Sequence, residues 1–357
     1  MRVSKRAILA LCLGYTACAD SAQPPAADSP LPCERRAAWP GGDLSSGVWH
    51  RVNAPHGIGQ SGNPLPIDAI VDSCEAIVSL AHDPGPGGKV YIPGPADLLW
   101  SADGNDWQTR DMATSAFYRD MAWGNGVWVA VGENMGAGVV AVSTRADASG
   151  WREVFHHDMV FRSVAFGSGV FVAVTQLGVI VSSDGERWHW AKLPDKQALY
   201  FEVAFGAGRF VVAGVGATLQ SSDGEHWSEA SCGAAGCPAI QPPSGPASTI
   251  IALQEIRYVG GVFYAFGGSG NMQSPDGLTW DVFTGTRFPD AAVGDSLLGL
   301  TQSEQNAGSV LQQSVDGTES WQSLPLGTDA NAADCAREYC VVAGRTLLVF
   351  EPAPSGS

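Results

Sequence analysis

One short phrase recurs along the chain and restricts its fold more than any other feature. It reads SSDGERW at residues 182–188 and SSDGEHW at residues 221–227. Looser copies are SADGNDW at 101–107, SPDGLTW at 274–280, and SVDG at 314–317 followed by Trp321. Asp-Gly between apolar segments predicts a hairpin turn, because Gly adopts a positive φ and the Asp side chain can accept a turn N–H. We expect the preceding Ser to bond the same turn and the Trp to open the return strand.

A second pattern precedes each turn. It is VAFGSGVFVAV at residues 164–174 and VAFGAGRFVVA at 203–213, with looser copies at 121–131 and 256–264. Each copy predicts a strand, a glycine turn and a strand, before a third strand that leads into the Asp-Gly turn. Four short antiparallel strands repeated roughly every 40 residues are typical of β-propeller blades. No stretch has a sustained 3.6-residue periodicity, so we expect almost no helix.

Aligning the copies predicts an all-β, seven-bladed β-propeller of four-stranded antiparallel blades. The units are expected at 66–111, 118–155, 161–193, 200–230, 254–283, 293–324 and 332–351. A Pro-, Gly- and Ser-rich insertion at 231–250 accounts for the longest gap between turns. The last unit has only three strands, and residues 47–52 read as an orphan fourth strand that carries Trp49. If this strand completes the last blade, the ring closes and no open edge remains.

Together the two patterns resemble the Asp-box, or BNR, repeat of the sialidase-like β-propeller superfamily. They are also similar to the repeats of the photosystem II assembly factor group. The resemblance covers about residues 66–351, although this box is one residue shorter than the usual form. It implies a propeller whose boxes are structural turns, in hydrolases and binding proteins alike. The box residues are Asp103, Asp184, Asp223, Asp276 and Asp316, with Trp107, Trp188, Trp227, Trp280 and Trp321.

The N-terminus has the pattern of an export signal. Basic residues at 2, 5 and 6 precede an apolar run at 7–14, which is too short to span a bilayer. Two ends are open: residues 15–18 form an imperfect lipobox that would place a lipid on Cys18, and Ala17-Cys18-Ala19 is an Ala-x-Ala cleavage site. We expect a periplasmic protein, an outer-membrane lipoprotein or a secreted protein. The expected divisions are a signal peptide at 1–18, a Pro-, Ala- and Ser-rich tether at 19–45, the propeller at 46–351 and a tail at 352–357.

Six cysteines remain after Cys12 and Cys18, and an even number in an exported chain suggests disulfides. Their spacing favours the pairs Cys232–Cys237, Cys335–Cys340 and Cys33–Cys74. A zinc site is the lesser alternative, because neither close pair is Cys-x-x-Cys and no His cluster accompanies them. We expect no metal and no cofactor.

The net charge of −16 argues against nucleic acid, whose phosphates need a basic footprint. The same charge suits solubility or a cationic partner. We expect a monomer that meets a membrane only through a lipid on Cys18.

A carboxylate recurs just before the first strand in six of the seven units, and we call the seven residues at this position the acidic row. Its members are Asp68, Asp120, Ser163, Glu202, Glu255, Asp295 and Asp334. In a propeller the first strands line the axis, so the row would form a ring at one channel mouth. A cation would suit such a ring, since hard cations prefer oxygen ligands. Alternatively, each acid accepts N–H bonds from its own connecting loop. Arg119 and Arg162, one residue earlier in two units, would partly neutralise the ring and belong to the same candidate site.

Catalysis would need further groups. Sialidase-like hydrolysis uses an Arg cluster that grips a carboxylate, a Tyr–Glu nucleophile pair and an Asp acid, whereas this chain has scattered arginines and no Arg-Ile-Pro sequence. Paired carboxylates about 5–10 Å apart can cleave glycosidic bonds, so Asp120, Glu202 and Glu255 are the candidate catalytic residues. Residues 156–158, His-His-Asp, form another polar cluster, but neighbours on an extended chain point to opposite sides.

These observations favour an exported, non-catalytic binding or scaffold module at the cell envelope, with a protein or a glycan as its partner. Two alternatives are open. One is a glycoside hydrolase or lyase of the sialidase-like type that acts on a polysaccharide. The other is an assembly factor for a membrane-protein complex.

Peptide mapping of the exported chain under non-reducing conditions should find the bonds Cys232–Cys237, Cys335–Cys340 and Cys33–Cys74. The reason is that exported chains meet an oxidising compartment, which keeps nearby cysteines paired. Any other connectivity among the six, or six free thiols, would contradict the prediction.

Overall fold

The computed structural model describes the centre of the chain almost continuously and the flanks as separate strands. It describes residues 48–52, 65–72, 76–82, 97–101, 108–112, 116–145, 148–194, 198–232, 253–267, 270–283, 289, 291–293, 296–302, 309–314, 321–325, 330–335, 340–344 and 347–351. The chain divides into two compact units. The first contains Met112–Thr286, and the second contains the described strands before Met112 and after Thr286. In the described ranges every regular element is a β-strand.

The first unit is built from four antiparallel sheets, named here by their first strands. Within each sheet the strands pair in chain order. The β6 sheet contains β6 (Phe117–Gly124), β7 (Val127–Asn134), β8 (Ala137–Ser143) and β9 (Arg152–His157). The β10 sheet contains β10 (Phe161–Gly167), β11 (Val170–Thr175), β12 (Val179–Ser182) and β13 (His189–Trp190). The β14 sheet contains β14 (Leu199–Gly206), β15 (Arg209–Val215), β16 (Leu219–Ser221) and β17 (Ser228–Glu229), and the β19 sheet contains β19 (Glu255–Val259), β20 (Val262–Gly267), β21 (Gly270–Ser274) and β22 (Thr279–Val282).

The second unit repeats this plan in three sheets of described strands. They are β2 (Leu65–Asp72), β3 (Ala76–His82), β4 (Asp97–Ser101) and β5 (Gln108–Asp111); β23 (Ala291–Val293), β24 (Ser296–Gln302), β25 (Ser309–Ser314) and β26 (Trp321–Pro325); and β27 (Ala330–Cys335), β28 (Cys340–Gly344) and β29 (Leu347–Glu351) with β1 (Val48–Val52). Strand β1 pairs antiparallel with β29, and Trp49 lies opposite Phe350. Cys335 lies opposite Cys340 in the β27–β28 pair, while a bond between them stays a prediction.

The first two strands of each sheet in the first unit are joined by the same tight turn. Both central residues have positive φ, as in Ser168 (47°) with Gly169 (79°) and Asn125 (50°) with Gly126 (76°). This is the type I′ geometry, whose twist matches that of the flanking strands. The second glycine of the recurring Phe-Gly-x-Gly pattern therefore supplies the turn.

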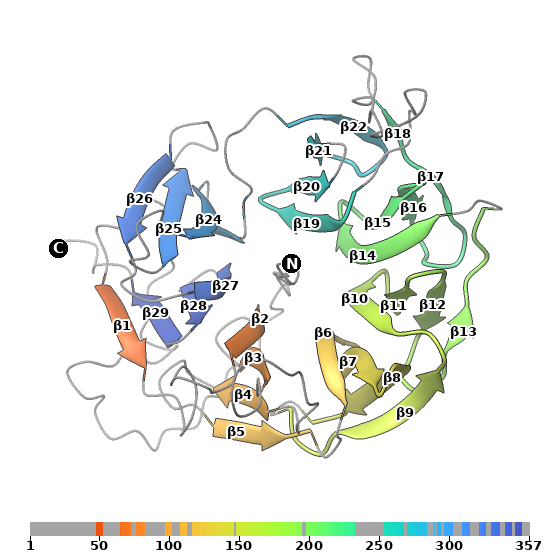
Figure 1. Ribbon diagram of the computed structural model, residues 1–357, viewed down its shortest axis with the longest axis horizontal. Helices are drawn as coiled ribbons and strands as arrows, with labels where there is room; N and C mark the ends of the chain where they lie inside the picture. The colour runs from red at the N-terminus through yellow and green to blue at the C-terminus, as the bar shows by residue number, and fades with distance from the viewer. Residues whose placement is uncertain are drawn as a thin grey trace. The chain divides into compact units, whose positions relative to one another are not determined.

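The first glycine of the pattern instead lets the next sheet approach. A Cβ on Gly124 would lie 2.2 Å from the ring of Phe166, and a Cβ on Gly167 would lie 2.1 Å from the ring of Phe205. The same relation joins Gly206 to Tyr258. Each aromatic ring thus covers the glycine of the preceding sheet, and β6, β10, β14 and β19 lie side by side, with the later strands of each sheet further out (Figure 1).

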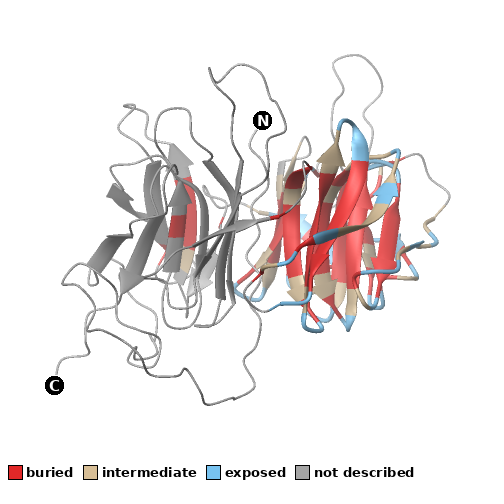
Figure 2. Ribbon diagram, turned by 90° about the horizontal axis from the view of Figure 1, so that it is seen from below, coloured by how far each residue is buried: buried red, intermediate tan, exposed pale blue. Residues whose placement is uncertain are grey.

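Apolar side chains between the sheets form the core of the first unit. Between the β10 and β14 sheets, Val172 and Val181 meet Val203, Phe210 and Trp227, all of them buried. Figure 2 shows buried residues running along the strands, with the exposed ones gathered at the strand ends. Burial of both faces explains why these strands read as nearly continuous apolar runs.

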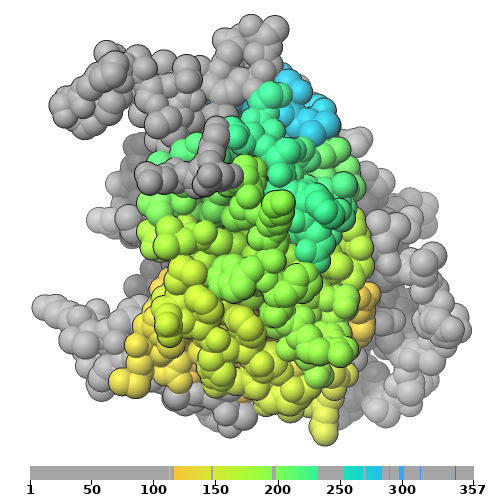
Figure 3. Space-filling view, turned by 90° about the vertical axis from the view of Figure 1, so that its right-hand side faces the viewer, coloured from red at the N-terminus to blue at the C-terminus, as the bar shows by residue number. Residues whose placement is uncertain are grey.

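The outer strands are linked from sheet to sheet as well. Strand β18 (Ser231–Cys232) leaves the β14 sheet and pairs in parallel with β22, so the β19 sheet has five strands instead of the expected four. An isolated parallel bridge between Lys192 and His226 makes the equivalent link one sheet earlier. Figure 3 shows the outer surface of this unit as successive bands in chain order.

Several predictions fall on residues outside the described ranges. These are the signal peptide at 1–18, the tether at 19–45 and the tail at 352–357, with Cys33, Cys74, Cys237, Asp295, Asp103, Trp107 and Asp316. Within the described ranges, no helix has the length and apolarity that crossing a membrane requires.

Replacing Gly167 by Ala should lower the free energy of unfolding by about 1–3 kcal/mol, because the new methyl group would overlap the Phe205 ring. Urea denaturation of the purified protein measures this. In a Phe205→Ala background the ring is absent, so Gly167→Ala should lower the free energy of unfolding by a smaller amount. Equal costs in both backgrounds would contradict the proposed contact.

Candidate functional site

A β-bulge near the start of the first strand precedes three members of the acidic row in the first unit, whereas Glu255 in β19 pairs with Phe266 without a register shift. The register shifts between Tyr118 and Asp120 in β6, between Phe161 and Ser163 in β10, and between Tyr200 and Glu202 in β14. A bulge inserts one extra residue and re-aims the side chains around it. The row member follows the bulge in each case, and we call this end of the sheets the bulge end.

In the second unit two of the described first strands carry a bulge, and one of these two follows the pattern. In β2 the shift falls between Pro66 and Asp68, so Asp68 follows the bulge. In β27 it falls between Ala330 and Ala332, so Ala332 holds the equivalent position and Asp334 lies two residues further along. The alignment by sequence placed Asp334 in the row because the bulge itself leaves no local signal there.

In the first unit, three members of the row bind the backbone of the next sheet. Asp120 Oδ2 accepts the N–H of Val164 at 2.9 Å, and Ser163 Oγ accepts the N–H of Val203 at 2.9 Å. Glu202 Oε2 accepts the N–H of Ile256 at 2.9 Å. All three bonds are buried. The first strand of a sheet leaves a row of edge N–H groups without a strand partner, and a buried donor needs an acceptor.

The structure therefore places an N–H acceptor at these positions, and the donor differs from the one expected. Asp120 also accepts the N–H of Met121, the next residue of β6, at 2.9 Å, whereas the sequence suggested donors in the connecting loop. The second donor is a strand more than 40 residues away, which local pattern could not indicate. In the described part of the chain, no three His, Cys, Asp or Glu side chains come together as a metal site.

A basic pair lies beside the row, at the extra residues of two bulges. Arg119 Nη2 is paired with Glu133, at the end of β7. Arg162 has no carboxylate partner in the described ranges, and its guanidinium carbon lies 5.3 Å from the centroid of the Phe201 ring. Burial lowers the pKa of Arg162, the nearby charge of Arg119 lowers it further, and Glu133 partly opposes this. Phe201 is itself the extra residue of the third bulge.

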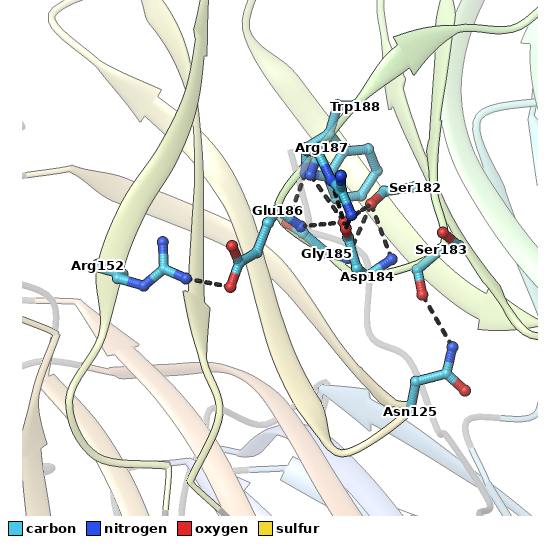
Figure 4. Close-up of polar contacts among 9 residues, drawn as sticks. All are labelled: Asn125, Arg152, Ser182, Ser183, Asp184, Gly185, Glu186, Arg187 and Trp188. Atoms are coloured by element: carbon cyan, nitrogen blue, oxygen red, sulfur yellow. Dashed lines mark hydrogen bonds and ion pairs between the residues drawn. The ribbon is translucent and has the colours of Figure 1, made fainter.

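The Asp-Gly turns lie at the opposite end of the strands, and each is held by its own seven residues (Figure 4). Asp184 Oδ1 accepts the N–H groups of Glu186 and Arg187, both at 2.9 Å. Ser182 Oγ accepts the N–H of Gly185 at 2.8 Å, and Trp188 Nε1 donates to the Gly185 carbonyl at 2.7 Å. The turns at Asp223 and Asp276 repeat the bonds to Asp and Ser.

These bonds favour the ionised carboxylate. The pKa of Asp184 is lowered mainly by the N–H of Arg187, then by the N–H of Glu186 and the Arg187 side chain. At Asp223 and Asp276, partial burial raises the pKa, but hydrogen bonds outweigh it and the net shift is downward.

The turns also hold the preceding sheet. Glu186 pairs with Arg152 of β9, and Asn125 Nδ2 donates to the carbonyl of Ser183 at 3.0 Å (Figure 4). Glu225 contacts His189 of β13 at 2.7 Å in the same way. A Cβ on Gly185 would lie 3.0 Å from Val129, so little space separates the turn from the neighbouring strands. All of these contacts are structural.

The side chains of His156 and His157, in the polar cluster at 156–158, do not point toward one common site. His156 faces Glu153 at 3.4 Å, while His157 accepts the N–H of Met159 at its Nδ1 and contacts Trp190 edge to face, at 4.9 Å between ring centroids. Trp190 is 42 % exposed.

Comparisons with known proteins identify the fold. No family model matches the sequence, and no curated protein matches it. Among solved structures, a streptogramin B lyase is 10 % identical, with a TM-score of 0.56, covering 87 % of this chain and 99 % of that one. A catalytically inactive virginiamycin B lyase from Staphylococcus aureus with quinupristin is 11 % identical, with a TM-score of 0.55, covering 85 % and 99 %. The WD40 propeller domain of Doa1 is 10 % identical, with a TM-score of 0.53, covering 87 % and 98 %.

At these identities the likeness shows the fold alone. The chain has a β-propeller fold made of repeated antiparallel sheets, as the sequence predicted.

Replacing Ser163 by Ala should lower the free energy of unfolding by about 1–3 kcal/mol, because the buried N–H of Val203 loses its acceptor. Ser183 is the matched control, since it is exposed and only its carbonyl is bonded. Ser183→Ala should change stability by no more than about 0.5 kcal/mol. Urea denaturation of both variants measures the difference, and equal effects would contradict the tether.

The protein should also lose stability in acid through its Asp-Gly turns. A folded-state pKa below the unfolded value of about 3.9 gives stability that is complete above that value and is lost as the pH falls below it. The triple variant Asp184→Asn, Asp223→Asn, Asp276→Asn should be less stable at pH 7 and should lose less stability between pH 5 and pH 2.5 than the parent. Urea midpoints across this range test it, with Asp281→Asn, an exposed position on β22, as control.

Proposed function

We propose that this chain is an exported, non-catalytic propeller that binds a protein or a glycan at the cell envelope. One observation carries the proposal. Asp120 and Glu202, two of the three candidate catalytic carboxylates, each accept a buried backbone N–H of the next sheet. A carboxylate in that role is held by the fold and is poorly placed to exchange protons or attack a substrate.

The third candidate, Glu255, contacts Arg257 at 3.2 Å, and both side chains are largely buried. An ion pair of this kind also favours a structural role, because a carboxylate beside a guanidinium stays ionised and is a poor general acid. Each of the three acids thus has a partner within the fold, which favours a structural role over that of a glycosidase acid or nucleophile.

The binding surface of the proposal is the bulge end of the first unit. The connections between sheets and the turns between second and third strands lie there, where rigid strands hold loops that can vary. The basic pair, Trp190 and the exposed side chains of Met135 and Leu177 are at this end. Polar and aromatic groups together suit a protein surface or a sugar.

The finer architecture is part of the proposal. We infer seven blades of Asp-box type, closed by the pairing of β1 with β29, because the described strands form seven sheets. The bonds of the Asp-Gly turns support the Asp-box assignment. The signal-like residues 1–18, the tether and the six cysteines support export, with or without a lipid on Cys18.

A glycan array, a pull-down from envelope extract and a polysaccharide-hydrolysis screen on the mature protein test the proposed function. Binding without product is expected. The hydrolase alternative requires turnover that Asp120→Ala, Glu202→Ala or Glu255→Ala abolishes in folded protein, and such turnover would overturn the proposal. Capture of one membrane-protein complex, with no glycan bound, would instead favour the assembly-factor alternative.

A further inference from the structure

Two positive charges and one negative charge meet at the bulge end of the first unit. Arg119 and Arg162 come from the neighbouring strands β6 and β10, and Glu133 comes from the end of β7. Glu133 is ion-paired with Arg119, and its negative charge raises the pKa of Arg162. The group therefore carries one excess positive charge, in a chain whose net charge is −16.

The Arg162 side chain is partly buried and lacks a counterion in the described ranges. Its Nε is shielded from solvent and has no hydrogen-bond partner. Its guanidinium stacks over Phe201 instead. A cation over an aromatic face recovers only part of its lost hydration, and a partly buried charge is normally paired. An unpaired guanidinium next to a second one is therefore costly unless an anion joins them.

The geometry points to a binding site for a singly charged oxyanion of a ligand, held by Arg162 and by the Arg119–Glu133 pair. It rests on the proposed binding function and names the ligand's charge. The guanidinium carbon of Arg162 lies over the Phe201 ring, and carboxylates and phosphates bind a guanidinium at its in-plane N–H edge.

The charge balance selects the class of anion. A carboxylate or a phosphodiester carries one negative charge, which matches the excess of one. A phosphomonoester carries close to two at neutral pH and would bring the second toward Glu133. A uronic acid in a glycan and a phosphodiester thus share the chemistry that this site would recognise.

The positions of the two arginines support a ligand role over a structural one. Both are extra residues of bulges, so neither takes part in the regular strand register. The residues that follow them, Asp120 and Ser163, already make the bonds that join the sheets. The arginines are thus available without loss of those bonds.

Calorimetric titration of the mature protein tests the site with four probes at low salt: glucuronate, glucose, dimethyl phosphate and inorganic phosphate at pH 8. We expect glucuronate or dimethyl phosphate to bind, whichever is the natural class, and glucose to bind at least about tenfold more weakly. Arg162→Gln should weaken the bound anion by about tenfold or more. Glu133→Gln should increase the affinity for the same anion, because it removes the negative charge that lies beside Arg119.

Arg152→Gln is the matched control, since Arg152 is an exposed arginine that pairs with Glu186 far from the bulge end. It should bind as the parent does. Equal binding of glucuronate and glucose, no binding of either monoanion, tighter binding of inorganic phosphate, or an Arg162→Gln variant that binds normally would overturn the inference. If the glycan array or the pull-down finds a ligand that the Arg162→Gln variant binds as tightly as the parent does, the proposed function stands and the proposed anion site is wrong. If neither experiment finds a ligand, the proposed function is wrong.

Discussion

Unpaired backbone N–H groups on the first strand of each sheet are the constraint on which the first unit depends. That strand has a partner on one side only, and the buried N–H groups of Val164, Val203 and Ile256 on its free edge find acceptors on the preceding sheet. A buried donor without an acceptor costs about 1–3 kcal/mol. Asp120, Ser163 and Glu202 remove this cost by accepting N–H bonds across the sheet boundary. Sheet-to-sheet packing thus has a polar, directional component besides its apolar one.

The repeat encodes both kinds of contact in a few residues. Within a sheet, the second glycine of the repeat makes the tight turn between the first and second strands. The Asp-Gly box makes the turn between the third and fourth strands. Between sheets, the aromatic residue of one repeat, such as Phe166, covers the first glycine of the preceding repeat. The glycine of the Asp-Gly box lies close to valines of the preceding sheet, as Gly185 does to Val129. A repeat that carries both halves of each contact can be added to a neighbour of the same kind, which is the physical basis of such arrays.

The acidic row shows how a repeated charge can suggest a site that the fold uses for another purpose. Seen as a pattern, carboxylates at one strand end suggest a cation site. At Asp120 and Glu202 the neighbouring sheet brings N–H donors to the carboxylate oxygens, so these two acids also bind the backbone. Of the two arginines that occupy the bulges, Arg119 is paired with Glu133, and Arg162 lacks a counterion in the described ranges.

The sequence alone determined what is local. The Asp-Gly turn is held by contacts among residues 182–188, so the phrase predicts its own geometry, and the alternation of apolar runs with turns predicts four-stranded sheets. Only the tertiary structure decided the partners of Asp120 and Glu202, the isolation of Arg162 and the exposure of Trp190. These depend on where a strand of the next sheet places its N–H groups and its rings, and that placement is fixed by the packing of one sheet on the next.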